Sequence, residues 1–218
     1  MMVRRKHFEQ DLEELKNDVL KMGSMVEERI NQAVNSLVEQ DIKLANHVID
    51  NDDDLDEYEV KIEQKCIKLL ALQQPVAKDL RTIDMISKIA TDLERMGDLA
   101  QNIAIVASKV VDEKLIKSLI DLPRMKEVVI SMIRDSLEAF VELDVDKARE
   151  AGLRDDKVDN LDRQIFRELL TYMMEDPRSI RQGNNLIFVS RYLERTGDHA
   201  TNICEKIIYM ATADWVNY

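Results

Sequence analysis

The 218-residue sequence has few of the residues that break helices or cross-link chains: three prolines, five glycines and two cysteines. Scarce proline and glycine, together with the lack of alternating apolar and polar runs, argue against a β-rich fold and favour long helices. Cys66 and Cys204 show no C-x-x-C spacing, so we expect two reduced core residues rather than a disulfide or a zinc site.

Long hydrophobic runs are also absent. No apolar run approaches the length of a membrane span, and the basic start "MMVRRKHFEQ" has no apolar segment behind it. We therefore expect a cytoplasmic protein with no direct membrane insertion.

Basic residues are fewer than acidic ones. The chain has 31 Lys and Arg against 43 Asp and Glu, for a formal net charge of −12. Repulsion at long range argues against binding to nucleic acid or to an anionic membrane. The same balance suits the binding of cations or of a basic partner.

Apolar residues spaced three and four apart predict long amphipathic helices. One stripe runs from Phe8 to Leu37, and a second begins after Asp41 and is ended by Pro75. The third, from Ile83 to Val111, has the heptad spacing of helices that pack nearly parallel or antiparallel. The predicted fold class is all-α.

The second half of the chain repeats the first. At an offset of 103 residues Met22 meets Met125 and Asp41 meets Asp144, and the third stripe returns at an offset of 100. An internal duplication explains this agreement better than chance similarity. We predict two tandem, pseudo-symmetric three-helix bundles, with six long helices in all. The first bundle covers residues 1–115 and the second covers 116–218.

Paired acidic residues recur in register with this duplication. Residues four apart on a helix share one face, where like charges repel unless a cation lies between them. With 43 acidic residues a single pair would carry no information, so the signal is the repetition. The four pairs are Asp52/Asp56 and Asp155/Asp159 on the second helices, and Glu94/Asp98 and Glu194/Asp198 on the third.

A glycine stands inside each third helix, directly before the aspartate. Gly97 and Gly197 lie in the apolar stripe, and a glycine inside a helix costs about 1 kcal/mol relative to alanine. Close approach of a neighbouring helix is the simplest reason for both. Such an approach would bring the carboxylates of two helices together, partly shielded from water.

Asn102 and Asn202 extend the same faces with neutral oxygen donors. An all-oxygen site of this kind suits Mg²⁺, Mn²⁺, Ca²⁺ or iron, whereas structural zinc sites normally use Cys or His. The competing interpretation is that Arg95 and Arg195 neutralise the acids as ordinary surface ion pairs. The repetition around a glycine favours a metal site.

Other site motifs are missing. His199 has Leu99 as its counterpart, so it lies outside the repeated pattern, and neither half supplies the Glu-x-x-His of di-iron bundles. No P-loop, nucleophile elbow or dinucleotide-binding glycine pattern occurs. We therefore assign no catalytic residues.

The motifs "DLERMGD" and "YLERTGDHATN", with "QQPVAKDLR" before the first, resemble those of the PhoU family over nearly the whole chain. The resemblance implies multinuclear clusters of divalent or trivalent ions at the E(D)-x-x-x-D motifs. Iron, Mn, Mg, Ca and Zn all stay open.

The resemblance also implies a function: the protein is expected to be not an enzyme but a negative regulator of phosphate uptake and of phosphate-starvation signalling. The expected partners are the ATPase subunit of the phosphate ABC transporter and the sensor histidine kinase of the phosphate regulon, and the expected assembly is a homodimer. Because the chain is acidic and has no basic cluster, we expect phosphate status to arrive through the transporter rather than by binding of free phosphate.

Three alternatives stay open at this point. A metalloenzyme of the phosphohydrolase type would use a two-metal carboxylate site. A metal-storage protein is disfavoured by the small number of sites. An accessory protein of a different phosphate permease would share the two-bundle plan.

Overall fold

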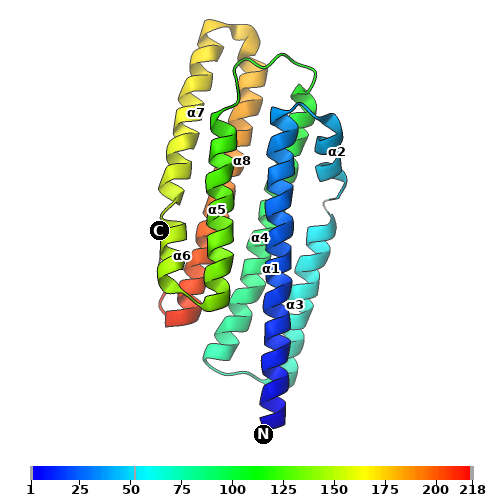
Figure 1. Cartoon of the computed structure of the whole chain (residues 1–218), viewed down its shortest axis with the longest axis vertical. Coiled ribbons are helices and arrows are strands. Elements are labelled where there is room, and N and C mark those ends of the chain that lie inside the picture. Colours follow the sequence, from blue (N-terminus) through cyan, green and yellow to red (C-terminus); the bar gives the residue numbers. More distant parts are fainter. Residues whose placement is uncertain (1, 52, 217–218) are drawn as a thin grey trace.

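The computed structural model describes residues 2–51 and 53–216, and within these ranges it contains helices and no strand. Six long helices lie side by side along the molecule (Figure 1), which confirms the predicted all-α architecture. In chain order the elements are α1 (Met2–Val38), α2 (Ile42–Asp50), α3 (Asp53–Gln73), α4 (Lys78–Val110), α5 (Asp121–Glu142), α6 (Val145–Gly152), α7 (Asp155–Glu175), the 3₁₀ helix η1 (Pro177–Ser179) and α8 (Ile180–Thr212).

The first helices of the two halves, α1 and α5, pack against each other in opposite directions. Glu27 accepts a hydrogen bond from Arg134 at 2.8 Å, and Asn35 accepts one from Lys126 at 3.4 Å. The higher-numbered residue of α1 contacts the lower-numbered residue of α5, so the two helices are antiparallel. This pairing joins the two halves along one side of the molecule.

The last helices of the two halves, α4 and α8, form a second antiparallel pair. Asp92 contacts His199 at 3.0 Å, and Arg81 donates to the backbone carbonyl of Met210 at 3.3 Å. The four helices α1, α4, α5 and α8 thus form the centre, while α3 and α7 lie at opposite edges (Figure 1).

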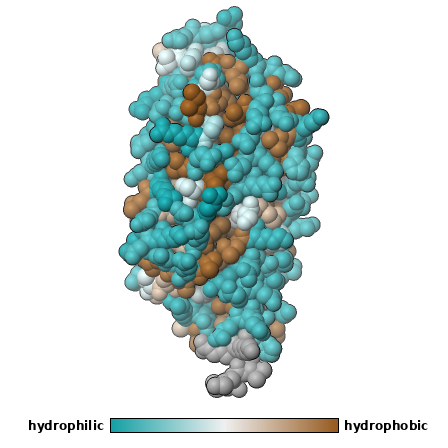
Figure 2. Space-filling view, viewed as in Figure 1, coloured by the Kyte–Doolittle hydropathy of each residue, from teal (hydrophilic) through white to brown (hydrophobic). Residues whose placement is uncertain are grey.

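The predicted apolar stripes form the core. A stripe of one side chain per turn on each central helix turns inward and is almost fully excluded from solvent, as amphipathic helices require. The exposed fraction is 0–1% for Leu15, Val19, Met22, Val26, Ile30, Ala33, Leu37, Ile83, Ile86, Ala90, Leu93, Ala100, Leu186, Leu193, Ala200, Cys204 and Ile207. The outward faces of α1 and α5 are mostly hydrophilic with separate apolar patches (Figure 2).

The turn after the first helix of each half is repeated in detail. Gln40 and Leu143 both have a left-handed φ of 53°. The next residues, Asp41 and Asp144, cap α2 and α6 by accepting backbone N–H bonds two and three residues ahead. The register inferred from the sequence therefore holds at the level of individual hydrogen bonds.

The prediction of one uninterrupted second helix after Asp41 was wrong. The structure has two helices there, with α2 ending at Asp50 and α3 beginning at Asp53. The buried Arg29 guanidinium of α1 binds the backbone carbonyl of Asn51, which takes that carbonyl out of a helical ladder. The second half is divided in the same way between α6 and α7, so the interruption belongs to the repeat.

The expected boundary between residues 115 and 116 falls in the connection between α4 and α5. Contacts between the halves run along both central helix pairs. The division into two separate folding units, 1–115 and 116–218, stays a prediction.

Candidate metal centre

The first carboxylate cluster lies between α3 and α4. Burial first, and then the negative charges of Asp98, Glu59 and Asp56, raise the pKa of Glu94 to about 7. The pKa of Asp98 is raised as well, by burial first and then by Asp56 and Glu59. Asp52, the fourth acid expected here, lies outside the described residues. Asp56, Glu94 and Asp98 lie close enough for their charges to act on one another.

The second carboxylate cluster lies between α7 and α8. Burial first, and then the nearby negative charges, of which Asp198 is the strongest, raise the pKa of Asp155 to about 6. Burial also raises the pKa values of Glu194 and Asp198, with Asp198 and Asp159 respectively as the next causes. All four predicted acids of the second half therefore act on one another.

The glycines beside the clusters are sites of close helix approach, as predicted. A Cβ atom at Gly97 would overlap Cδ1 of Leu55 on α3. At Gly197 it would lie 2.9 Å from Asp155 Oδ1 and 3.3 Å from Val158 Cγ1 on α7. The absence of a side chain lets α7 approach α8 closely enough to carry the Asp155 carboxylate inward.

One carboxylate oxygen of the second cluster is buried without a donor. Among the described residues no group donates a hydrogen bond to Asp155 Oδ1, although the atom is shielded from solvent. An unpaired buried carboxylate oxygen is costly, and a bound cation would remove that cost. This atom is therefore a candidate ligand for a cation.

Sequence reasoning missed two further acids, Glu59 and Asp162. They occupy the same repeat position, three residues after Asp56 and Asp159, a spacing that again shares one helix face. Glu59 contributes to the raised pKa values of the first cluster. Asp162 is already paired, since Ser190 Oγ donates to it at 2.8 Å and Arg191 at 3.1 Å.

The two asparagines are less clearly part of the clusters. The Asn102 side-chain nitrogen donates to the backbone carbonyl of Asp98 at 2.9 Å, so only its oxygen could serve as a ligand. Asn202 is half-buried, and its backbone carbonyl accepts from Lys206 at 3.4 Å. Their assignment as ligands stays a prediction.

The donor chemistry of both clusters fits a hard or borderline cation. Carboxylate oxygens that are partly buried and close to like charges gain from a positive ion between them. In the part of the chain that the structure describes, no three His, Cys, Asp or Glu side chains are already gathered around a metal position.

A different polar contact joins the two halves. Asp92 of α4, only 5% exposed, lies between His199 Nδ1 at 3.0 Å and Lys206 Nζ at 2.6 Å, both on α8. The repeat counterpart of Asp92 is Tyr192. The contact of Asp92 with His199 and Lys206 occurs only once in the repeat. A search for duplicated residues could therefore not find it. His199 is thus an interface residue.

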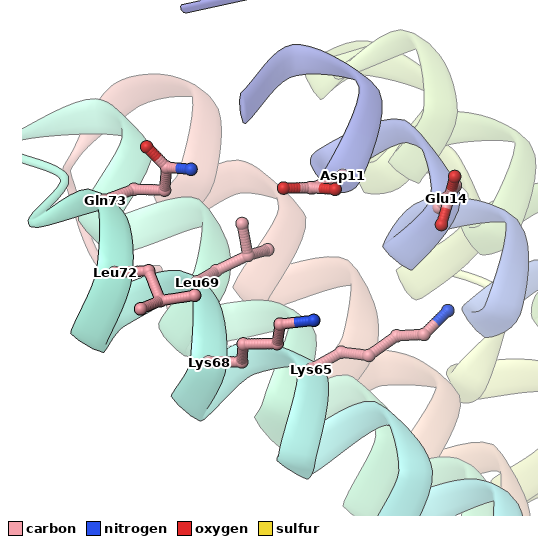
Figure 3. Close-up of a pocket in the computed structure, with 7 residues that line it drawn as sticks. All are labelled: Asp11, Glu14, Lys65, Lys68, Leu69, Leu72 and Gln73. Carbon is pink, nitrogen blue, oxygen red and sulfur yellow. The ribbon is translucent and has the colours of Figure 1, made fainter. Parts of the chain in front are cut away.

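A shallow hollow lies further along α3, toward its C-terminal end (Figure 3). Asp11 and Glu14 of α1 lie across from Lys65 and Lys68 of α3, with Leu69 at the floor. The ammonium groups make it unsuitable for a metal cation. The candidate site is therefore formed by the carboxylate clusters rather than by this hollow.

The fold and the two clusters define a class: duplicated helical proteins with a candidate cation site in each half. The family model described as PhoU domain matches residues 19–107 and 122–207, one match in each half. The chain belongs to the PhoU family.

Similar proteins agree over nearly the full length. A relative from Clostridium acetobutylicum, named "Phosphate-specific transport system accessory protein PhoU homolog", is 46% identical over 98% of each chain. The crystal structure of PhoU from Pseudomonas aeruginosa matches with a TM-score of 0.91 and 39% identity, covering 95% of this chain and all of that one. A "phosphate transport system regulatory protein PhoU" from Streptococcus pneumoniae matches with a TM-score of 0.91 and 31% identity over 97% of this chain and all of that one.

These relatives are named as accessory or regulatory proteins, not as enzymes, which confirms the expectation of a non-enzymatic family. None of the described helices is both long and apolar enough to span a membrane.

Proposed function

We propose that this protein is a negative regulator of phosphate uptake and of phosphate-starvation signalling, acting as a metal-binding adaptor. The names of its relatives support the role in phosphate transport. The observation that carries the metal-binding part is the recurrence of carboxylates with raised pKa values at matching positions of both halves: the half-buried Glu94 and Glu194, and the exposed Asp98 and Asp198.

The residues that would hold metal come from two helices in each half. In the first half Glu94 and Asp98 of α4 act with Asp56 of α3, and in the second the Asp155 carboxylate is held inward beside Gly197. Bound divalent or trivalent ions would neutralise these acids and so change the charge of the surface that a partner meets. Iron and manganese suit the donor set as well as magnesium or calcium does.

The proposed partners are the ATPase subunit of the phosphate ABC transporter and the sensor histidine kinase of the phosphate regulon. The protein would work as a homodimer in the cytoplasm, held at the membrane through these partners. Its net charge of −12 disfavours nucleic acid as a partner. The names of the relatives give the phosphohydrolase alternative no support.

Co-purification from phosphate-replete cells tests this proposal. We expect the tagged protein to retain the kinase and the ATPase, and to lose them when Glu94, Asp98, Glu194 and Asp198 are all changed to alanine. A matched control changes the exposed Asp84, whose ion pair with Lys88 lies on α4 away from the clusters, and should keep both partners. Retention of both partners by the fourfold variant would refute the metal-dependent adaptor, and failure of the unchanged protein to retain either would refute the adaptor itself.

A further inference from the structure

The two carboxylate clusters differ in the positive charge that the chain itself places beside them. Arg29 of α1 is only 7% exposed. Its Nη1 lies 3.8 Å from the position that a Cβ would take at Gly97, and its Nη2 donates to the backbone carbonyl of Asn51. The guanidinium is therefore buried where α1 and α4 meet the junction of α2 and α3, beside the first cluster.

The charge of Arg29 acts on the acids of that cluster. Together with Arg95 it opposes the burial and the like charges that raise the pKa of Asp98. A buried guanidinium is screened less by solvent than an exposed one, so it is the more effective counter-charge. The first cluster is thus partly neutralised before any metal arrives.

In the second half no cation stands at the sequence position that matches Arg29, and Arg154, at the junction of α6 and α7, is engaged by Asp135 and by the backbone carbonyl of Ser131 on α5. The counterpart of Arg29 at the 103-residue offset is Met132, which is completely buried. Two arginines that act on this cluster are exposed to solvent. Arg191, whose side chain is 55% exposed, pairs with Glu194 at 3.0 Å, and Arg195 is also exposed. His199 also acts on Asp198 but is engaged by Asp92.

The Asp155 carboxylate is the part of the second cluster that most favours a cation. Its buried Oδ1 has no hydrogen-bond donor among the residues that the structure describes. Entry of a cation would relieve this unpaired atom. At the first cluster an entering cation would instead meet the buried guanidinium and be repelled by it.

We infer that Arg29 is a built-in cation that competes with metal at the first cluster, so that the second cluster fills first and more tightly. This inference rests on the metal binding proposed above. It makes the two halves unequal in function although their acids match.

A purely structural role for Arg29 is the competing explanation. Its hydrogen bond to Asn51 could serve only to hold the junction of α2 and α3. Gln at position 29 can donate a hydrogen bond without a charge, whereas Lys keeps the charge. The two substitutions therefore separate the electrostatic role from the structural one.

The test is a titration of the metal-free protein with Mn²⁺, followed by calorimetry and by the electron paramagnetic resonance signal of free Mn²⁺. We expect two phases, with the tighter one lost in Glu194→Gln/Asp198→Asn and the weaker one lost in Glu94→Gln/Asp98→Asn. Arg29→Gln should strengthen the weaker phase on the order of tenfold or more, while Arg29→Lys should leave it near the unchanged protein. Arg95→Gln, which removes an exposed arginine from the same cluster, is the matched control and should have a smaller effect.

A single class of equal sites in the unchanged protein would overturn the inference, and so would Arg29→Gln with an unaltered weaker phase. Either result would leave the proposed metal binding standing. Absence of Mn²⁺ binding to the unchanged protein would instead overturn the metal-binding part of the proposed function. Far-ultraviolet circular dichroism of each variant checks that the helices are intact.

Discussion

At the scale of single residues, the two cluster glycines and the acids beside them depend on each other. A side chain at Gly97 would press on Leu55, and one at Gly197 would displace the Asp155 carboxylate. The glycines therefore determine how closely α3 and α7, which carry these acids, approach α4 and α8. Helix propensity alone would favour alanine at both positions.

Replacing Gly97 with alanine should lower the free energy of unfolding by about 1–2 kcal/mol, because the new methyl group overlaps a side chain that is only 1% exposed. Gly183→Ala is the matched control, since the atoms nearest to its Cβ are Cγ and Sδ of the flexible Met173. That control should be neutral or slightly stabilising in urea unfolding. Equal effects of the two substitutions would contradict our account of Gly97.

A second prediction concerns Gly197. Alanine there should weaken metal binding at the second cluster, because Asp155 Oδ1 would have to move from a contact of 2.9 Å. The Mn²⁺ titration should show a weaker tight phase and an unchanged weak phase. A loss confined to the weak phase would mean that the clusters have been assigned to the wrong halves.

At the scale of helices, the α4–α8 pair is held by an asymmetric polar contact. Asp92 meets both His199 and Lys206, and its surroundings are shielded from solvent. Breaking a buried pair from one side leaves the other charge without compensation, which costs more than the pair contributes. The contact thus specifies how the two halves align.

Asp92→Ala should therefore lower the free energy of unfolding by about 3 kcal/mol. The control is Asp84→Ala on the same helix, which removes an exposed pair with Lys88 and should cost at most about 0.5 kcal/mol. Chemical denaturation of both variants measures the difference. Similar stabilities would show that the Asp92 contact does not hold the interface.

The helices also show what sequence reasoning could and could not reach. The apolar stripes and the duplication predicted the six long helices, because burial of one face depends on local spacing alone. The break after Asp50 was missed because the apolar stripe continues through it: Val48 and Leu55, on either side, are both buried. Asp92 was missed because its partners lie in the other half, where no local pattern signals them.

At the scale of the whole molecule, the clustered acids make stability depend on pH. The folded-state pKa values of Glu94, about 7, and Asp155, about 6, lie above their ordinary values of 4.5 and 3.8. The folded protein therefore holds more protons than the unfolded chain between about pH 4 and 7, and this part of its stability is lost as pH rises through that window.

The metal-free protein should accordingly melt at a lower temperature at pH 7.5 than at pH 5, and Glu94→Gln/Asp155→Asn should flatten this dependence. Bound metal should reverse the trend, since deprotonated carboxylates bind cations better. Differential scanning calorimetry at several pH values, with and without Mn²⁺, measures both effects. A melting temperature that rises with pH in the metal-free protein would contradict the raised pKa values.

The central claim is that each half of the molecule holds its own cation site. The most direct measurement is the metal content, by mass spectrometry, of the protein and of two variants, Glu94→Ala/Asp98→Ala and Glu194→Ala/Asp198→Ala, each saturated with Mn²⁺ beforehand. Our account predicts that each variant loses about half of the bound metal while its helical circular dichroism signal is kept. Full metal content in both variants, or complete loss in either, would contradict it.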